Sequence, residues 1–405
     1  MPVRRNTSRY VLMLGAMSAL GAMSTDMYLP NLPDVAADLG TSATMAQLTM
    51  TFMMLGGALG QLVIGPLSDR FGRRRPALIG TGLHIVTCAL CAWAPAIGPL
   101  MVYRAAMGVF NASAGVVATA VIRDRFVGRE AARIMSRLML VIGVAPLFAP
   151  TIGSLIGRWA GWRGVFVGLG LYGVFLLVSM WWKLPETHPR EHRAKRVGAT
   201  MRGYGILLRD GHFVALAAVP ALLSAVLMSY IVASPFVLQQ QYGLGKLQFA
   251  LVFAVNGIGL VGGAQLNASL VRRFSSSQIL RVALPGSMLA CGGLLLVAAT
   301  GWGGLPALLA MLFAAMALQN LSPSNASALA LTRHGERAGT AAAWIGFLQS
   351  VVPAIVAPVV GVMGNHAWAM GLVMAASASV ALAILAAGTP IYRPGGVELL
   401  DRIPS

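Results

Sequence analysis

Two charged residues lie inside segments that are otherwise apolar, and their types are suited to proton chemistry. Asp26 stands in STDMYLPNLP, near the end of the first apolar run, and Arg104 stands in YRAAMGVFNASAG. A charged side chain in hydrocarbon is costly unless it is paired or hydrated, so such residues are functional candidates. Burial favours the neutral carboxyl group, whereas a nearby guanidinium favours the carboxylate. Asp26 could therefore bind and release a proton as Arg104 withdraws and approaches.

The depth of the two residues allows an ion pair. Asp26 lies about 25 Å along an ideal helix from Arg9, and Arg104 lies about 8 Å from Pro99. Both therefore fall in the same half of a hydrocarbon core about 30 Å thick. We expect Asp26 and Arg104 to couple proton binding to conformational change. The alternative is that the pair only holds two helices together.

The composition indicates the elements that position these residues. Of 405 residues, 57% are apolar and 10% are charged, whereas an ordinary soluble protein carries about 25% charge. This balance excludes a disordered chain and disfavours a soluble multidomain enzyme, so lipid must cover the apolar surface. The three cysteines are too few for a disulfide framework. No signal-peptide cleavage site follows the first apolar run, and we expect that segment to be retained as an anchor.

The apolar runs predict an all-α membrane protein of twelve transmembrane helices. The expected spans are 10–30, 45–66, 77–97, 99–121, 134–157, 163–184, 212–235, 247–270, 278–299, 303–328, 338–362 and 366–388. If the N-terminus is cytoplasmic, the short loops on that side hold all of the 30 basic residues except Arg104, Arg158, Arg163 and Lys246. The sequence therefore predicts cytoplasmic N- and C-termini. The basic residues form no single patch, which disfavours nucleic-acid binding.

The longest hydrophilic stretch divides the chain almost in half. We expect an N-terminal six-helix bundle (1–184), a cytoplasmic linker (185–211), a C-terminal six-helix bundle (212–390) and a cytoplasmic tail (391–405). A weak internal repeat relates LSDRFGR around Asp69 to LVRRFSS around Arg272. Two parallel halves with a site near the midplane are typical of transporters.

The loop GPLSDRFGRRRP after the second span carries a distinctive pattern. Its glycines allow tight turns, and its aspartate can meet a cationic side chain. The pattern resembles the signature loop of the major facilitator superfamily. The resemblance implies a latch in which the aspartate and an arginine meet an acidic residue at the end of the fourth span. The implied latch residues are Gly65, Asp69, Arg70, Gly72, Arg73 and Asp124. The alternative is a plain positively charged anchor.

The fifth span contains prolines that bend a helix and glycines that permit close packing. Its segment LVIGVAPLFAPTIGSLIG resembles the antiporter signature of proton-coupled exporters, although Ala149 and Ser154 replace glycines of the usual form. We expect a gating helix that contains Gly143, Pro146, Pro150 and Gly153. The alternative is ordinary small-residue packing.

Together these segments, with NLSPSNASALAL in the second half, resemble the Bcr/CflA type of drug-resistance transporter within the major facilitator superfamily. The resemblance implies proton-coupled export of small hydrophobic antibiotics of the bicyclomycin or chloramphenicol kind across a bacterial cytoplasmic membrane. We expect a drug and protons as partners, no cofactor and a monomer. Polarity within spans suggests a substrate cavity lined by Tyr28, Asn111, Ser113, Tyr230, Asn256, Gln319 and Asn320, and helix–helix hydrogen bonding is an equal alternative.

Other functions are less compatible with the residues. His84, Cys88 and Cys91 share one helix stripe that could bind a soft metal, but packing is the simpler explanation, and we expect no metal site. No nucleotide-binding loop and no cluster of catalytic groups is present, so we do not expect an enzyme. A selectivity filter is not visible. The nearest rival is a proton-coupled sugar or metabolite transporter of the same fold, which usually needs a more polar interior.

Overall fold

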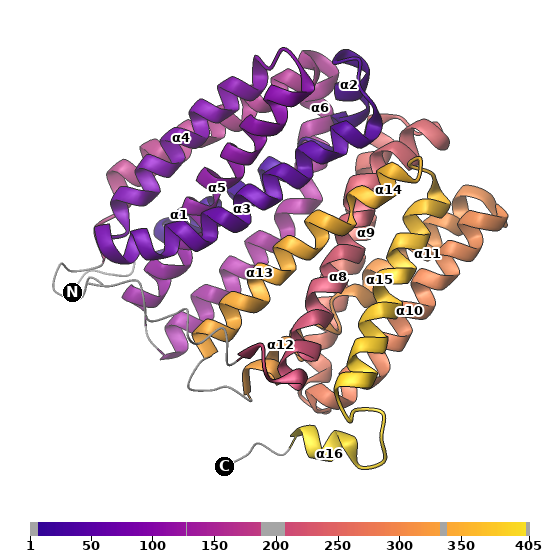
Figure 1. Cartoon of the computed structure of the whole chain (residues 1–405). Coiled ribbons are helices and arrows are strands. Elements are labelled where there is room, and N and C mark those ends of the chain that lie inside the picture. Colours follow the sequence, from indigo (N-terminus) through magenta and orange to yellow (C-terminus); the bar gives the residue numbers. More distant parts are fainter. Residues whose placement is uncertain (1–6, 127, 188–206, 333–337, 402–405) are drawn as a thin grey trace. The chain divides into compact units, whose positions relative to one another are not determined.

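The computed structural model describes residues 7–126, 128–187, 207–332 and 338–401, and all regular elements in these ranges are helices (Figure 1). Ten of the described helices are long and apolar enough to cross a membrane. The chain forms two compact units. The first contains Met1–Val197 and Lys246–Leu251, and the second contains Gly198–Gly245 and Val252–Ser405. Most of the expected linker (188–206) and the end of the expected tail (402–405) lie outside the described residues.

The first unit contains long helices joined by short turns. These are α1 (Thr7–Asp26), the short η1 (Leu29–Asn31) and α2 (Leu32–Asp38), α3 (Ala43–Phe71), α4 (Arg74–Ala92), α5 (Ile97–Arg125) and α6 (Gly128–Lys183). The helix α6 covers both spans expected at 134–157 and 163–184. It changes direction at Gly161, whose φ of +65° is readily adopted only by glycine. The first span is shorter than expected because α1 ends at Asp26, ahead of Pro30.

Close helix crossings depend on glycine in this unit. A Cβ atom at Gly56 of α3 would overlap the Ala105 carbonyl of α5, and one at Gly108 of α5 would overlap the Met53 carbonyl of α3. Small residues at these crossings let two backbones approach within van der Waals contact, which is how transmembrane helices gain packing energy without a hydrophobic driving force. The core of the unit then forms from α1, α4, α5 and α6, around Leu14, Met17 and Val117.

The second unit has more interrupted helices. It contains α8 (Gly211–Pro235), the π-helical η3 (Phe236–Gln241), all but the first six residues of α9 (Lys246–Leu270), α10 (Ser276–Thr300), α11 (Gly304–Gln319), α12 (Pro323–Thr332), α13 (Ala338–Val356), α14 (Pro358–Val362), α15 (Ala367–Gly388) and α16 (Gly396–Asp401). The spans expected at 303–328 and 338–362 are each two helices. Both breaks precede a proline that lacks a backbone N–H, Pro323 and Pro358.

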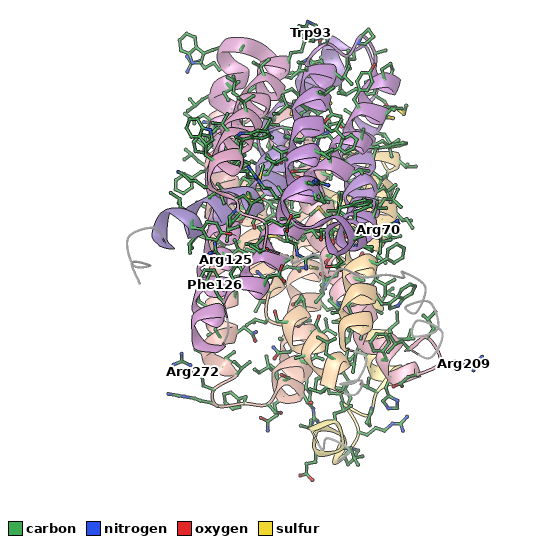
Figure 2. All side chains as sticks on the ribbon, turned by 90° about the vertical axis from the view of Figure 1, so that its left-hand side faces the viewer. Arg70, Trp93, Arg125, Phe126, Arg209 and Arg272 are labelled. Carbon is green, nitrogen blue, oxygen red and sulfur yellow. The ribbon has the colours of Figure 1, made fainter. Side chains whose placement is uncertain are left out.

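The ends of the first unit differ in charge. Trp93, just after α4, lies at the opposite end of this unit from Arg70 and Arg125 (Figure 2). The loop between α3 and α4 and the end of α5 therefore place arginines at one end, and α6 ends with Lys183. This charged end is called the latch end below.

Candidate functional site

Asp26 is the last residue of α1 and is buried, with 5% of its surface exposed. Its carboxylate makes no hydrogen bond and no ion pair with any described residue. Directly after it, the chain turns through Tyr28 and Pro30 into η1. A buried carboxyl group without a partner is costly as an anion, and one added proton removes most of that cost. Asp26 therefore has the environment expected of a proton-binding group.

Arg104 of α5 is fully buried, with 0% of its surface exposed. Its Nη1 donates to the Ser24 carbonyl oxygen at 3.0 Å, and its Nη2 contacts the Met50 sulfur at 3.1 Å. The guanidinium carbon lies 4.6 Å from the centre of the Tyr28 ring and 5.7 Å from that of Phe166. Aromatic faces and a carbonyl thus stabilise this charge in place of a carboxylate.

The expected ion pair between Asp26 and Arg104 is absent from the structure. The guanidinium is held at the carbonyl of Ser24, two residues before Asp26, and the aromatic rings cover its faces. Depth estimates put both residues at a similar level, but they do not give the direction in which each side chain leaves its helix. The Nε of Arg104 is buried without a hydrogen-bond partner.

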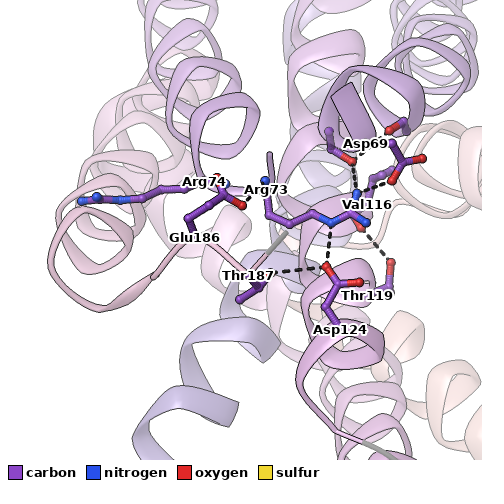
Figure 3. Close-up of polar contacts among 10 residues, drawn as sticks. Asp69, Arg73, Arg74, Val116, Thr119, Asp124, Glu186 and Thr187 are labelled. Atoms are coloured by element: carbon purple, nitrogen blue, oxygen red, sulfur yellow. Dashed lines mark hydrogen bonds and ion pairs between the residues drawn. The ribbon is translucent and has the colours of Figure 1, made fainter. Parts of the chain in front are cut away.

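The latch end brings three of the expected residues together (Figure 3). Arg73 is 2% exposed, and its guanidinium donates to Asp124 at 2.8 Å and to Asp69 at 2.5 Å. It also donates to the Ser68 hydroxyl at 2.7 Å. Burial alone would lower the pKa of Arg73, but the hydrogen bonds to Asp124 and Asp69 outweigh burial and raise it. Arg73 therefore stays charged and joins the ends of α3 and α5.

Other latch predictions have mixed outcomes. Gly72 has φ +90°, so the sharp turn between α3 and α4 requires glycine there. Gly65 has open space around it, and its carbonyl accepts from Ser68 at 2.9 Å. The guanidinium of Arg70 lies 5.4 Å from the centre of the Phe71 ring. Among the described residues, Arg73 is the arginine that forms ion pairs with Asp69 and Asp124.

Glu186 also binds at the latch end, although it was not among the expected latch residues. Its carboxylate accepts from the backbone N–H groups of Arg73 at 2.8 Å and Arg74 at 3.4 Å, at the start of α4 (Figure 3). An acidic side chain at a helix N-terminus satisfies free N–H groups and favours the helix dipole. Thr187 donates to Asp124 at 3.3 Å. The segment just after α6 therefore adds two contacts to the cluster around Arg73 and Asp124. PETHPR was assigned to the linker, and only its acidic residue could have suggested this role.

The expected gating helix packs directly against the end of α1. A Cβ at Gly153 would overlap the Met27 carbonyl, and one at Gly157 would overlap the Asn31 side chain. Asn31 also donates to the Gly153 carbonyl at 3.0 Å. Pro150 lies in α6 next to this contact; Gly143 and Pro146 lie earlier in α6, where side chains are outside the described part. The antiporter-like segment and the Asp26 segment therefore form one tight joint.

The expected cavity residues mostly bond within or between helices. Tyr28 is buried, donates to or accepts from Thr49 at 3.2 Å and covers Arg104. Ser113 bonds to the Phe110 carbonyl of its own helix at 2.6 Å. The remaining pairs are Asn256 to Tyr230 at 2.9 Å, Asn320 to the Leu260 carbonyl at 3.1 Å, and Gln319 to the Leu223 carbonyl. Asn111 alone keeps a buried oxygen without a partner. These contacts favour the helix–helix alternative.

His84, Cys88 and Cys91 form a buried stripe on α4. His84 Nε2 lies 3.4 Å from the Cys88 sulfur, and both side chains are buried with Cys91. Among the described residues, no three His, Cys, Asp or Glu side chains converge as metal ligands. The stripe therefore packs inside the first unit.

Comparison with known proteins identifies the family. A profile of the Major Facilitator Superfamily matches residues 14–358. The uncharacterized MFS-type transporter YdgK of Bacillus subtilis is 33% identical over 383 residues, which cover 94% of this chain and 95% of that protein. The bicyclomycin resistance protein homolog of Haemophilus influenzae is 30% identical over 361 residues, which cover 89% and 90%.

A solved structure shows the same fold. The D-xylose-proton symporter aligns with a TM-score of 0.74 at 17% identity and covers 92% of this chain and 96% of its own. These matches agree with the multi-pass helical structure and with the loop that places Arg73 between Asp69 and Asp124. The chain belongs to the Major Facilitator Superfamily, with the drug-resistance transporters of that superfamily, and is a multi-pass membrane transporter and not an enzyme.

Proposed function

We propose that this protein exports small hydrophobic drugs of the bicyclomycin or chloramphenicol kind across the bacterial cytoplasmic membrane in exchange for protons. The observation that carries the proposal is Asp26, a buried carboxyl group that has no partner among the described residues and lies at the joint between α1 and the antiporter-like part of α6. The drug-resistance relative supports the direction and the substrate class.

The chemistry follows from the environment of Asp26. In the described conformation its burial favours the protonated carboxyl group. A conformation that hydrates Asp26 stabilises the carboxylate and releases the proton on the other side of the membrane. Because Met27 and Gly153 touch through their backbones, a change at Asp26 is transmitted to α6 without a flexible intermediate. One proton driven by about 150 mV supplies about 3.5 kcal/mol, enough for a several-hundred-fold gradient of a neutral drug.

The proposal includes a topology of twelve spans with both termini in the cytoplasm. Ten helices pass the length and hydropathy criteria, α1 adds another apolar helix of 20 residues, and Gly161 divides α6 into two spans. The arginine-rich latch end would then face the cytoplasm. We propose that the working form is a monomer.

Transport by reconstituted protein tests the function. Proteoliposomes with an imposed pH gradient should accumulate chloramphenicol in exchange for protons, and Asp26→Asn should abolish the gradient-driven component. Asp26→Glu keeps a titratable group and should retain part of it. Glu398→Gln, on the exposed surface of α16, is the matched control and should transport like wild type. Gradient-driven transport at the wild-type rate in Asp26→Asn would remove Asp26 from the mechanism.

A second function is a proton-coupled symporter for a sugar or metabolite. The fold shared with the D-xylose-proton symporter favours it. The two functions differ in direction: an exporter exchanges substrate against protons, whereas a symporter moves both the same way. Acidifying the side of the vesicle that holds the drug should drive it out for a symporter and retain it for an antiporter.

A further inference from the structure

A cluster of three side chains lies at the end of the first unit opposite the latch. Asp38, the last residue of α2, accepts from the Trp162 indole N–H at 3.0 Å and forms an ion pair with Arg163. The Arg163 guanidinium carbon lies 4.3 Å from the centre of the Trp162 ring, and Arg163 also donates to the Ala94 carbonyl at 3.4 Å. We call Asp38, Trp162 and Arg163 the outer cluster. Through these contacts the outer cluster joins the end of α2, the kink of α6 at Gly161 and, through the Ala94 carbonyl, the turn after α4.

A column of rings connects the outer cluster to the buried arginine. Trp162 packs edge-on against Phe166 with ring centres 6.0 Å apart, and Phe166 packs against Tyr28 at 5.3 Å. Tyr28 and Phe166 are the rings that cover Arg104. Exposure falls along the column, from 48% for the Asp38 side chain to 3% for Trp162 and 0% for the inner residues. The contacts are therefore continuous from solvent to the buried charge.

Apart from the two rings, Arg104 has few contacts that could hold its guanidinium. These contacts are the Ser24 carbonyl and the sulfurs of Met50 and Met107, and sulfur is a weak acceptor. Cation–π contacts require the ring to stay under the guanidinium, because the attraction depends on the ring face. If Tyr28 or Phe166 shifts, the guanidinium loses these faces. Asp26 lies between Ser24 and Tyr28, the two residues that hold Arg104, and makes no ion pair with any described residue, so its carboxyl group is then the acceptor that the guanidinium would reach.

We propose that Trp162 is a positioning residue: anchored by Asp38 and Arg163, it fixes the ring column that keeps Arg104 away from Asp26. This inference rests on the proposed function for its transport consequence. Loss of the column lets Arg104 approach Asp26 and stabilise the carboxylate. Protonation of Asp26 then requires a more acidic medium. The pH at half-maximal proton-driven drug transport should fall by about 0.5–1 unit.

Other groups around Arg104 do not replace this role. Tyr28 faces the guanidinium from the turn after α1, and His84, Cys88 and Cys91 interact with it electrostatically from α4. Met50 of α3 and Phe166 of α6 carry no charge. None of these groups is a carboxylate. Asp26 is therefore the acidic group whose ionisation a displaced Arg104 would favour most.

The test compares variants of two tryptophans at the same turn. Trp162→Ala removes both the ring and the N–H group, and its transport profile should shift to acidic pH. Trp162→Phe keeps a ring against Phe166 and should restore a profile close to wild type. Trp159→Ala is the matched control, because Trp159 is 84% exposed and lies three residues earlier. An unshifted profile in Trp162→Ala, or equal shifts in Trp162→Ala and Trp159→Ala, would overturn the proposal.

A second pair of measurements keeps the test decisive. If Trp162→Ala does not fold, Phe166→Leu interrupts the column at its centre while it keeps an apolar side chain, and the same acid shift is expected; its absence would refute the column. A second readout does not depend on transport. In a Cys291→Ser background, a maleimide can label only Cys88 and Cys91, the buried thiols near Arg104, and the labelling rate measures how well the ring column shields them. Labelling should be several-fold faster in Trp162→Ala than in Trp159→Ala. If wild type transports no drug but labelling still rises, the proposed function fails and the column stands.

Discussion

The two loops related by the internal repeat behave differently. In the first unit, Arg73 is buried and bonded to Asp69 and Asp124. In the second unit, Arg272 and Arg273 are exposed, and neither makes an ion pair with a described residue. The loops share basic residues after a long helix, but among the described residues only the first loop has acidic side chains that bind its arginine. A repeat in sequence therefore does not imply a repeat of the interaction, because the partners decide it.

The interiors of the two units differ in the same way. The first buries charges at Asp26, Arg73 and Arg104. The described part of the second is held by neutral pairs such as Asn256 with Tyr230 and Asn325 with Asn267, the latter at 2.7 Å. Charge that can be neutralised by a proton is suited to coupling, whereas neutral amides provide stability that does not change with pH. The predictions below test this division.

The largest stability effect is expected at the latch. Arg73→Ala leaves Asp124 without its cation and should lower the free energy of unfolding by about 2–3 kcal/mol, because the arginine is buried and its partners are partly exposed. Denaturation by SDS in mixed micelles measures this change. Arg272→Ala, in the related loop of the second unit, should change it by less than about 0.5 kcal/mol. Similar losses in both variants would show that the loops are equivalent.

Glycine packing gives a sharper test inside the second unit, because two adjacent glycines of α9 differ in surroundings. A Cβ at Gly263 would overlap the Ala317 carbonyl, whereas nothing lies within 4 Å of one at Gly262. Gly263→Ala should cost about 1–3 kcal/mol through overpacking. Gly262→Ala should be neutral or slightly stabilising, since alanine favours a helix. Apparent unfolding temperatures of the two variants in detergent measure the difference, and equal values would contradict the close helix crossing.

Neutral pairing in the second unit should affect stability and leave coupling unchanged. Tyr230→Phe removes the hydroxyl that Asn256 bonds to and should cost about 0.5–1 kcal/mol. The pH profile of drug transport should match that of wild type, because no ionisable group of the proposed coupling site is touched. Transport across a range of pH values checks this. A displaced profile would assign part of the coupling to the second unit.

The sequence could predict most of the charged features and few of their partners. Asp26 and Arg104 stand out because charge is rare in spans, and the signature loop pointed to Asp69, Arg73 and Asp124. The structure does not show the ion pair between Asp26 and Arg104, since helical rise gives the depth of a residue and says nothing of side-chain direction. Arg70 and Arg73 could not be separated by spacing alone. Only the folded turn at Gly72 shows which arginine points inward.

Other features needed three-dimensional contacts. Glu186 follows the last apolar residues of the first half, so its sequence context is that of a linker, and its binding to the start of α4 depends on where α6 ends. The interruption before Pro323 was visible in NLSPSN, yet the length of the apolar run favoured one continuous helix. The ring column from Trp162 to Arg104 joins α6, the turn after α1, and α5, and no local sequence pattern could connect them.

The smallest effect is expected at Asp38 in the first unit. Hydrogen bonds from Arg163 and then from Trp162 lower the pKa of Asp38 below its usual value. A lowered pKa stabilises the folded protein above the pKa of the unfolded chain, and this contribution is lost as the pH falls through the lowered value. Asp38→Asn should therefore be slightly less stable than wild type at neutral pH and equally stable in strong acid. Unfolding temperatures at a series of pH values measure this, and a constant difference would contradict the ion pair.

The carboxylate of Glu186 has a practical consequence for engineering the protein. The Glu186 carboxylate binds the free N–H groups at the start of α4. The chain is therefore held against the first bundle before the long polar segment begins. A protease site or a fluorescent domain inserted well beyond residue 187 should therefore leave that bundle intact, whereas shortening the chain to pull on Glu186 should loosen it. Split expression of the two halves is best attempted with the cut placed after this tether.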